Sequence, residues 1–152
     1  MGELGHFTTF ILAIDRISKN IKRVKDQEMA EYGIRSAHVI VLFNIAEKNG
    51  LNSTQLADAC GVDKSFISRI TSELENDNYI VRDKNSNGNI YKSKFVLTEK
   101  GEMVTKVIQE KVSKIVSEVG GSIPDHKKKT FYEVLTTFDE NIVKVLKDGD
   151  KR

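Results

Sequence analysis

The chain has 152 residues, of which 39% are hydrophobic and 30% are charged, and its formal net charge at pH 7 is +2. This length suits one domain with a real core, and no apolar run approaches the roughly 20 residues that a membrane helix needs. The N-terminus has Glu3 and His6 but no basic region before an apolar run, so we expect no signal peptide. A lone cysteine, Cys60, excludes an internal disulfide and fits a cytoplasmic protein.

Charge is spread almost evenly along the sequence. Residues 1–46 hold six Lys and Arg against five Asp and Glu, residues 47–100 hold eight against eight, and residues 101–152 hold ten against nine. The middle third is neutral, so binding of a polyanion there would depend on where the charges lie rather than on their sum.

The first half of the chain predicts helices only. Asp63 is well placed as an N-cap of the fourth helix, and Ser36 and Ser53 as N-caps of the second and third. Asn49-Gly50 and Gly61 are expected to end the second and third helices. The apolar spacing places the four helices at about 4–28, 36–48, 53–59 and 64–77.

The second half opens with two short β-rich segments. YIVRD (79–83) and KSKFVLT (92–98) flank the turn signal Asn87-Gly88, which predicts a two-stranded hairpin. Thr98 is expected to cap a fifth helix that runs to about residue 119, and Pro124 to open a last one.

Three predicted helices carry long apolar stripes. The first helix has little of its own chain to cover its stripe, so we expect a second copy of the chain to cover it. The stripes are Phe7, Ile11, Ile14, Ile17, Ile21 and Val24; Val104, Ile108, Val112, Ile115 and Val119; and Phe131, Leu135, Phe138, Ile142 and Val145.

The fourth helix has an unusual outward face. At 100° per residue, Phe66, Ile67, Ile70 and Leu74 fall on one arc and face the core. The opposite face is short, rich in donors and positive at its N-terminal end, which suits entry into a DNA major groove; a plain solvated face is the alternative. Its residues are Lys64, Ser65, Ser68, Arg69 and Ser72.

The preceding helix supports this interpretation. Ala57, Gly61, Ile67 and Ile70 have the spacing of a helix-turn-helix, in which a small residue and a turn glycine let two helices cross closely. The first turn of the supporting helix would then contact DNA phosphates through Ser53, Thr54 and Gln55.

The hairpin is basic and fits a wing beside that helix. Residues 82–100 carry a local charge of +3, whereas a merely solvated hairpin is the alternative. The cations are Arg82, Lys84, Lys92, Lys94 and Lys100.

The run STQLADACGVDKSFISRITSELENDNYIVRD, a hairpin and then LTEKG (97–101) resembles the MarR family of winged-helix transcription regulators over nearly the whole chain. The resemblance implies a mainly α fold with a small β-hairpin wing, a winged helix-turn-helix with long N- and C-terminal dimerisation helices. It implies one domain, 1–152, with DNA-binding residues 36–100 and dimerisation segments 1–34 and 101–152. It also implies a homodimer on double-stranded DNA, with wing contacts that include Lys84, Asn85, Lys92 and Lys94.

The sequence departs from the family at the wing. Many members have an Asp-Arg-Arg cluster after the wing tip, whose arginine enters the minor groove, whereas NGNIYKSK here has no arginine. We expect backbone contact through Lys92 and Lys94 rather than minor-groove reading. The family often binds small phenolic or anionic ligands between its two parts, and Arg35 and His38 are the candidates for such an effector. For His38 the alternative is a packed or capping histidine of the buried second helix.

Other kinds of site have little support. Cys60 has no basic neighbour in sequence and is expected to be a small buried residue, and the three histidines form no metal-ligand spacing. We expect no catalytic residue and no cofactor, since GxGxxG, P-loop, HExxH and CxxC motifs are absent from the sequence. The prediction is a homodimeric repressor of pseudo-palindromic operators; the alternative is a winged-helix dimer that binds proteins and has little DNA affinity.

Overall fold

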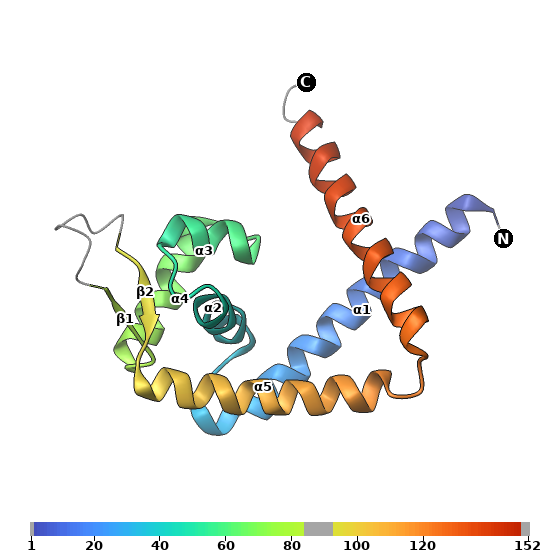
Figure 1. Cartoon of the computed structure of the whole chain (residues 1–152). Helices are drawn as coiled ribbons and strands as arrows, with labels where there is room; N and C mark the ends of the chain where they lie inside the picture. The colour runs from blue at the N-terminus through green and yellow to red at the C-terminus, as the bar shows by residue number, and fades with distance from the viewer. Residues whose placement is uncertain (1, 84–92, 150–152) are drawn as a thin grey trace. The chain divides into compact units, whose positions relative to one another are not determined.

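The computed structural model describes residues 2–83 and 93–149. Its elements confirm the predicted fold class, mainly α with one two-stranded antiparallel sheet (Figure 1). They are α1 (Glu3–Met29), the 3₁₀ helix η1 (Ala30–Tyr32), α2 (Ser36–Glu47), α3 (Ser53–Cys60), α4 (Lys64–Asn76), β1 (Ile80–Arg82), β2 (Phe95–Leu97), α5 (Glu99–Gly120) and α6 (Asp125–Gly149). The chain forms two compact units, Met1–Lys111 and Val112–Arg152.

Two of the predicted N-caps are correct. Asp63 caps α4, where its Oδ1 accepts a hydrogen bond from the N–H of Phe66 at 2.7 Å. Thr98 precedes α5, and its Oγ1 accepts from the N–H of Gly101 at 2.9 Å. Both side chains satisfy an amide of the first helical turn that has no partner within the helix.

The predictions of Ser36 and Ser53 as N-caps are wrong, because each is the first residue inside its helix. Asn52 is the N-cap of α3. Its Oδ1 accepts from the backbone N–H of Gln55, and its own backbone N–H donates to Gln55 Oε1, both at 3.0 Å. At α2 the cap position belongs to Arg35, and a side chain of α1 binds the first amide of the helix: Asp26 Oδ1 accepts from the N–H of Ser36 at 2.6 Å.

Left-handed residues end two of the helices as the sequence predicted. After α2, Asn49 has φ 51° and Gly50 has φ 100°. Gly61 ends α3 at φ 65°, and its N–H donates to the Asp58 carbonyl at 3.3 Å. A glycine adopts this conformation without the steric penalty of a Cβ, which lets the chain reverse between α3 and α4.

The sheet is shorter than the sequence predicted. Ile80 pairs with Leu97 and Arg82 with Phe95. Leu51 also pairs with Phe95 across an isolated bridge, with an N–H to carbonyl distance of 2.9 Å in one direction. The predicted turn at 87–88 lies outside the described residues.

The core of the first unit lies among α2, α3, α4, the sheet and α5. The elements α2, α3 and α4 contact one another, and α2 also contacts β2 (Figure 1). Burial of large apolar side chains is the main stabilising contribution here. The side chains that are almost fully buried include Leu42, Ile45, Leu56, Ile67, Ile70, Leu74, Ile80, Phe95 and Ile108.

The second unit contains the end of α5, a turn and α6. The N–H groups of Lys127 and Lys128 donate to the Pro124 carbonyl at 2.9 and 3.1 Å, so the proline stands just before the helix, as predicted. The apolar stripe of α6 is solvent-exposed in the single chain, with Phe131 56% and Phe138 44% exposed.

Candidate nucleic-acid interface

The helix α4 presents the predicted polar face to solvent. Lys64, Ser65, Ser68, Arg69 and Ser72 are all exposed. The opposite side is fixed in the core, because Ile67, Ile70 and Leu74 are at most 1% exposed. The structure therefore brings the five predicted recognition residues together on one exposed helix surface.

Two hydroxyls of this face already donate a hydrogen bond within the protein. Ser65 Oγ donates to Asp63 Oδ1 at 2.6 Å, and Ser72 Oγ donates to the Ser68 carbonyl at 2.8 Å. The bond from Ser65, together with the amide of Phe66, holds the pKa of Asp63 below its usual range. In this conformation Ser65 and Ser72 offer lone pairs to a ligand, which suits base amino groups rather than phosphates.

The guanidinium of Arg69 lies over an aromatic ring. Its Cζ is 5.4 Å from the centroid of Phe66, within the range of a cation–π contact. Phe66 is half-buried, so this ring supports an otherwise exposed side chain. Arg69 thereby keeps its donors on the outer face of α4, where a planar guanidinium can bind a guanine edge at two points.

The start of α3 lies in the same helix-turn-helix. Thr54 and Gln55 are exposed, whereas Ser53 is half-buried. Gln55 Oε1 accepts a hydrogen bond from the backbone N–H of Asn52. The side-chain NH₂ of Gln55 is therefore the group that could donate to a phosphate.

The wing residues have different surroundings. Lys94 is exposed. Arg82 is half-buried, with Nε 3.3 Å from Glu75 Oε1 and Cζ 4.3 Å from the centroid of Phe95. These contacts tie β1 to α4 and to the core. Of the other predicted wing contacts, Lys84, Asn85 and Lys92 lie outside the described residues.

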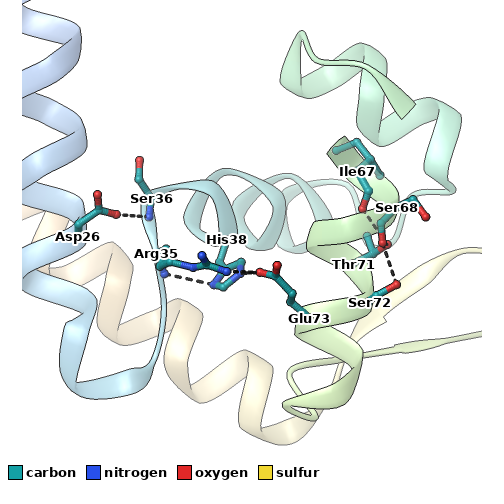
Figure 2. A network of polar contacts seen from close by, with 9 residues as sticks. All are labelled: Asp26, Arg35, Ser36, His38, Ile67, Ser68, Thr71, Ser72 and Glu73. Atoms are coloured by element: carbon teal, nitrogen blue, oxygen red, sulfur yellow. Dashed lines mark hydrogen bonds and ion pairs between the residues drawn. The ribbon is translucent and has the colours of Figure 1, made fainter. Parts of the chain in front are cut away.

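The two candidate effector residues bind a carboxylate of the protein itself. Arg35 Nη2 donates to Glu73 Oε2, and His38 Nε2 lies 2.8 Å from the same oxygen (Figure 2). The His38 side chain is 3% exposed and that of Arg35 is 61% exposed. The hydrogen bond from His38, followed by that from Arg35, holds the pKa of Glu73 below its usual range.

Cys60 is half-buried rather than fully buried as expected. Its Sγ lies 3.7 Å from Asn44 Nδ2, and burial raises the pKa of the thiol. A raised pKa disfavours the reactive thiolate, which agrees with a packing role for this residue.

Asn52, Asp26 and Glu73 are among the polar residues whose roles were not predicted from the sequence. Asn52 had a local signal, because Asn-x-x-Gln before an apolar residue is a capping pattern. Asp26 and Glu73 had none, since each binds a residue at least ten positions away along the chain.

Two other kinds of site were sought in the part of the chain that the structure describes, a metal site and a membrane span. Residues 2–83 and 93–149 contain no group of three or more His, Cys, Asp or Glu placed to hold a metal ion. Among the same residues, no helix is long and apolar enough to span a membrane.

Known proteins resemble the chain in sequence and in fold. Residues 32–87 match the model of the MarR family. An uncharacterised HTH-type transcriptional regulator of Bacillus cereus is 25% identical over 127 residues, which cover 82% of this chain and 83% of that protein. A MarR protein from Peptoclostridium difficile has the same fold, with a TM-score of 0.80 at 17% identity over 88% of this chain and 86% of that one. Over residues 32–87 the chain is thus similar to the MarR family, and its fold is one that solved MarR proteins share.

The matched MarR segment contains the whole helix-turn-helix, from before α2 to the beginning of the wing. A further structure with this fold is that of the S. aureus MepR–DNA complex, with a TM-score of 0.76 at 16% identity over 86% of this chain and 94% of that one. The matched family model and the relative from Bacillus cereus are those of transcriptional regulators. The resemblance drawn from the sequence is therefore confirmed.

Proposed function

We propose that the chain is a homodimeric, sequence-specific DNA-binding regulator that represses transcription from pseudo-palindromic operators. The observation that carries this proposal is the face of α4, where five small or cationic polar residues are exposed above a buried apolar arc. Short side chains allow close approach to base edges, and the N-terminal Lys64 places positive charge where phosphates would lie.

The related MepR structure supports DNA as the partner. That protein was solved as a complex with DNA, and this chain shares its fold. In our proposal the exposed α4 face enters the major groove, with the cytoplasm as the compartment of action. The supporting contacts to phosphate come from Ser53, Thr54, Gln55 and Lys94, and we extend them to Lys84, Asn85 and Lys92 of the wing.

The exposed apolar stripes support a dimer. Along α1, Phe7, Ile11, Ile14, Ile17 and Ile21 are 37–56% exposed in the single chain. In α6, Phe131, Leu135, Phe138, Ile142 and Val145 are 38–71% exposed. Contiguous apolar surface of this kind marks an interface, and we assign residues 1–34 and 101–152 to dimerisation and 36–100 to DNA binding. Two recognition helices would then contact half-sites about 34 Å apart.

An anionic effector is the finer part of the proposal. Arg35 and His38 already bind the Glu73 carboxylate, which demonstrates that the two donors can converge on one oxygen. A small carboxylate or phenolate would act by displacing Glu73 from Arg35, whose guanidinium is accessible. Because Glu73 belongs to α4, such a displacement would act directly on the recognition helix.

The test is selection of bound fragments from random and genomic DNA with the purified protein. We expect enrichment of an inverted repeat whose half-sites are one helical turn apart. Absence of enrichment at low salt would overturn the proposal and favour the alternative of a protein-binding module, which the neutral charge of residues 47–100 supports.

A further inference from the structure

Two glutamates flank the exposed face of α4, and they are held differently. On a helical wheel Glu73 and Glu75 lie roughly 110° and 50° from the mean direction of the five face residues, on opposite sides. Glu75 forms one ion pair with Arg82 at 3.3 Å. Through a single oxygen, Glu73 binds Arg35, the cap residue of α2, and His38 in the first turn of α2. The two flanks of the recognition helix are thus tied to different elements.

The buried side chain of His38 is the hydrogen-bond donor in its contact with Glu73. His38 Nδ1 accepts a hydrogen bond from the backbone N–H of Arg35 at 3.2 Å. This bond assigns the ring proton to Nε2, which then donates to Glu73 Oε2 at 2.8 Å. With a side chain only 3% exposed, His38 has little access to water if Glu73 moves away. The carboxylate is therefore held at one position relative to α2.

The same stretch of α2 is bound to α1. The N–H of Ser36 donates to Asp26 Oδ1 at 2.6 Å, one residue after Arg35 (Figure 2). We call Asp26, Arg35, Ser36, His38 and Glu73 the three-helix network. It runs from the long helix α1 through the first turn of α2 to the recognition helix α4.

We propose that Glu73 is a positioning residue for DNA recognition, which sets the rotation and position of α4 relative to α1 through the three-helix network. The inference rests on the proposed function for its DNA readout. It adds a role for a residue that touches neither base nor phosphate in the proposal. It also links the helix that presents the apolar stripe to the helix that presents Arg69.

The direction in which a substitution of Glu73 changes DNA affinity separates a positioning role from simple charge repulsion. Removal of an acid beside a DNA-binding face should strengthen binding, because repulsion of the phosphates decreases. A loss of positioning should weaken it. Glu73→Ala is therefore expected to weaken binding to the selected operator by about tenfold, within the range seen for residues that couple two sites.

Three further variants complete the comparison. Glu75→Ala removes the same charge from the opposite flank and is the matched control, with binding unchanged or tighter. His38→Gln keeps one donor and one acceptor, so it is expected to lose less DNA affinity than Glu73→Ala does. Glu73→Gln keeps the size of the side chain and one acceptor oxygen. It replaces Glu73→Ala if that variant does not fold, and a smaller loss of DNA affinity is expected for it.

A distance measurement without DNA tests the positioning itself. Spin labels are attached to cysteines introduced by Lys22→Cys on α1 and Asn76→Cys on α4, two positions that are exposed in the structure. Cys60→Ala removes the native thiol, so that only the introduced cysteines are labelled. Labelled chains are mixed with an excess of unlabelled chains, so that only distances within one chain are recorded. We expect a narrow distribution for the wild type and the Glu75→Ala variant and a shifted or broadened one for Glu73→Ala.

Weaker binding together with the altered distance distribution supports the inference. Binding by Glu73→Ala that equals or exceeds that of the wild type overturns it, as does an unchanged distribution. If the wild type binds no DNA at low salt, the proposed function fails instead. The distance distributions then decide the positioning role by themselves.

Discussion

Arg69 is the residue of α4 whose side chain can discriminate between bases most directly. It is exposed, always charged, and supported from below by the ring of Phe66 at 5.4 Å. A guanidinium that contacts a guanine edge at two points contributes about 1–3 kcal/mol of discrimination.

We therefore expect Arg69→Ala to weaken operator binding by about 1–3 kcal/mol and to relax the choice of base at one position of each half-site. Arg69→Lys is the matched control, since it keeps the charge but not the planar fork. It should retain affinity for unrelated DNA and lose discrimination. Titrations against the selected site and its single-base variants measure both, and an unchanged profile for Arg69→Ala would remove the residue from the site.

Glu73 gives the stability of the fold a pH dependence of known sign. Its pKa is lowered in the folded protein by His38 and then Arg35, so the folded state holds its proton less tightly than the unfolded chain. The stabilising contribution is complete above the ordinary glutamate pKa of about 4.3 and is lost as the pH falls through the lower folded value.

The free energy of unfolding of wild type and Glu73→Gln, measured by urea titration, should accordingly differ most near pH 7. The difference should shrink as the pH falls below about 4.3. Glu75→Gln, for which no comparable buried partner exists among the described residues, is the control. A difference between wild type and Glu73→Gln that stays constant from pH 7 to pH 3 contradicts the ion-pair description of this residue.

The local sequence pattern predicted the roles of some of these residues but not of others. The face of α4 follows from helical periodicity, which needs only the spacing of nearby residues. The partners of Glu73 are 35 and 38 positions away, and such pairs depend on how helices pack. For the same reason Arg82 was predicted only as a wing cation, although it also binds Glu75 and Phe95.

At the scale of elements, one glycine controls how closely α5 approaches the sheet. A Cβ built on Gly101 would lie 2.0 Å from the Tyr79 carbonyl oxygen, which belongs to the chain just before β1. Backbone cannot move away as a flexible side chain could. The close approach also lets the N–H of Thr98 donate to the same carbonyl at 3.1 Å.

Gly101→Ala is expected to destabilise the fold by about 1–3 kcal/mol or more, because it overpacks a backbone contact. Gly61→Ala is the informative comparison. A Cβ there meets nothing within 4 Å, so only the left-handed backbone is penalised, by about 1–2 kcal/mol. Replacement of Gly61 by Asn should recover part of that loss, whereas replacement of Gly101 by Asn should not. Thermal unfolding of the four variants measures this contrast, and equal recovery at both positions contradicts it.

The order of the elements was predictable, but the residues that cap α2 and α3 were not. Each predicted helix exists within a few residues of its expected bounds, since apolar periodicity extends over several turns. The caps of α2 and α3 differ from the prediction because the N–H of Ser36 donates to Asp26 and that of Gln55 donates to Asn52, so both predicted serines lie inside their helices. The bridge between Leu51 and Phe95 joins residues 44 positions apart, beyond the reach of any local signal.

At the scale of the whole molecule, the feature that a single chain does not explain is its exposed apolar surface. Ile17 lies in the stripe of α1 and is 50% exposed in the single chain. If a second copy covers this stripe, a buried carboxylate at that position would have no partner and would strongly disfavour association.

Ile17→Glu is thus expected to shift the protein from dimer to monomer at micromolar concentration and to abolish cooperative operator binding. Lys22→Glu changes the charge at another exposed position of α1 and serves as the control, with the dimer retained. Sedimentation equilibrium gives the oligomeric state of both. A wild type that sediments as a monomer, or an Ile17→Glu variant that remains a dimer, contradicts the assignment of this stripe.

The most direct test of sequence-specific DNA binding is one titration series. The binding constant of the wild-type protein is measured by fluorescence anisotropy for its selected site and for a scrambled duplex. The salt concentration is varied from roughly 50 to 200 mM, which includes physiological ionic strength. We expect the selected site to bind at least about 10³-fold more tightly, with affinity for both duplexes falling as salt increases. Equal affinity for the two duplexes, or a binding constant that does not change with salt, would contradict the proposal.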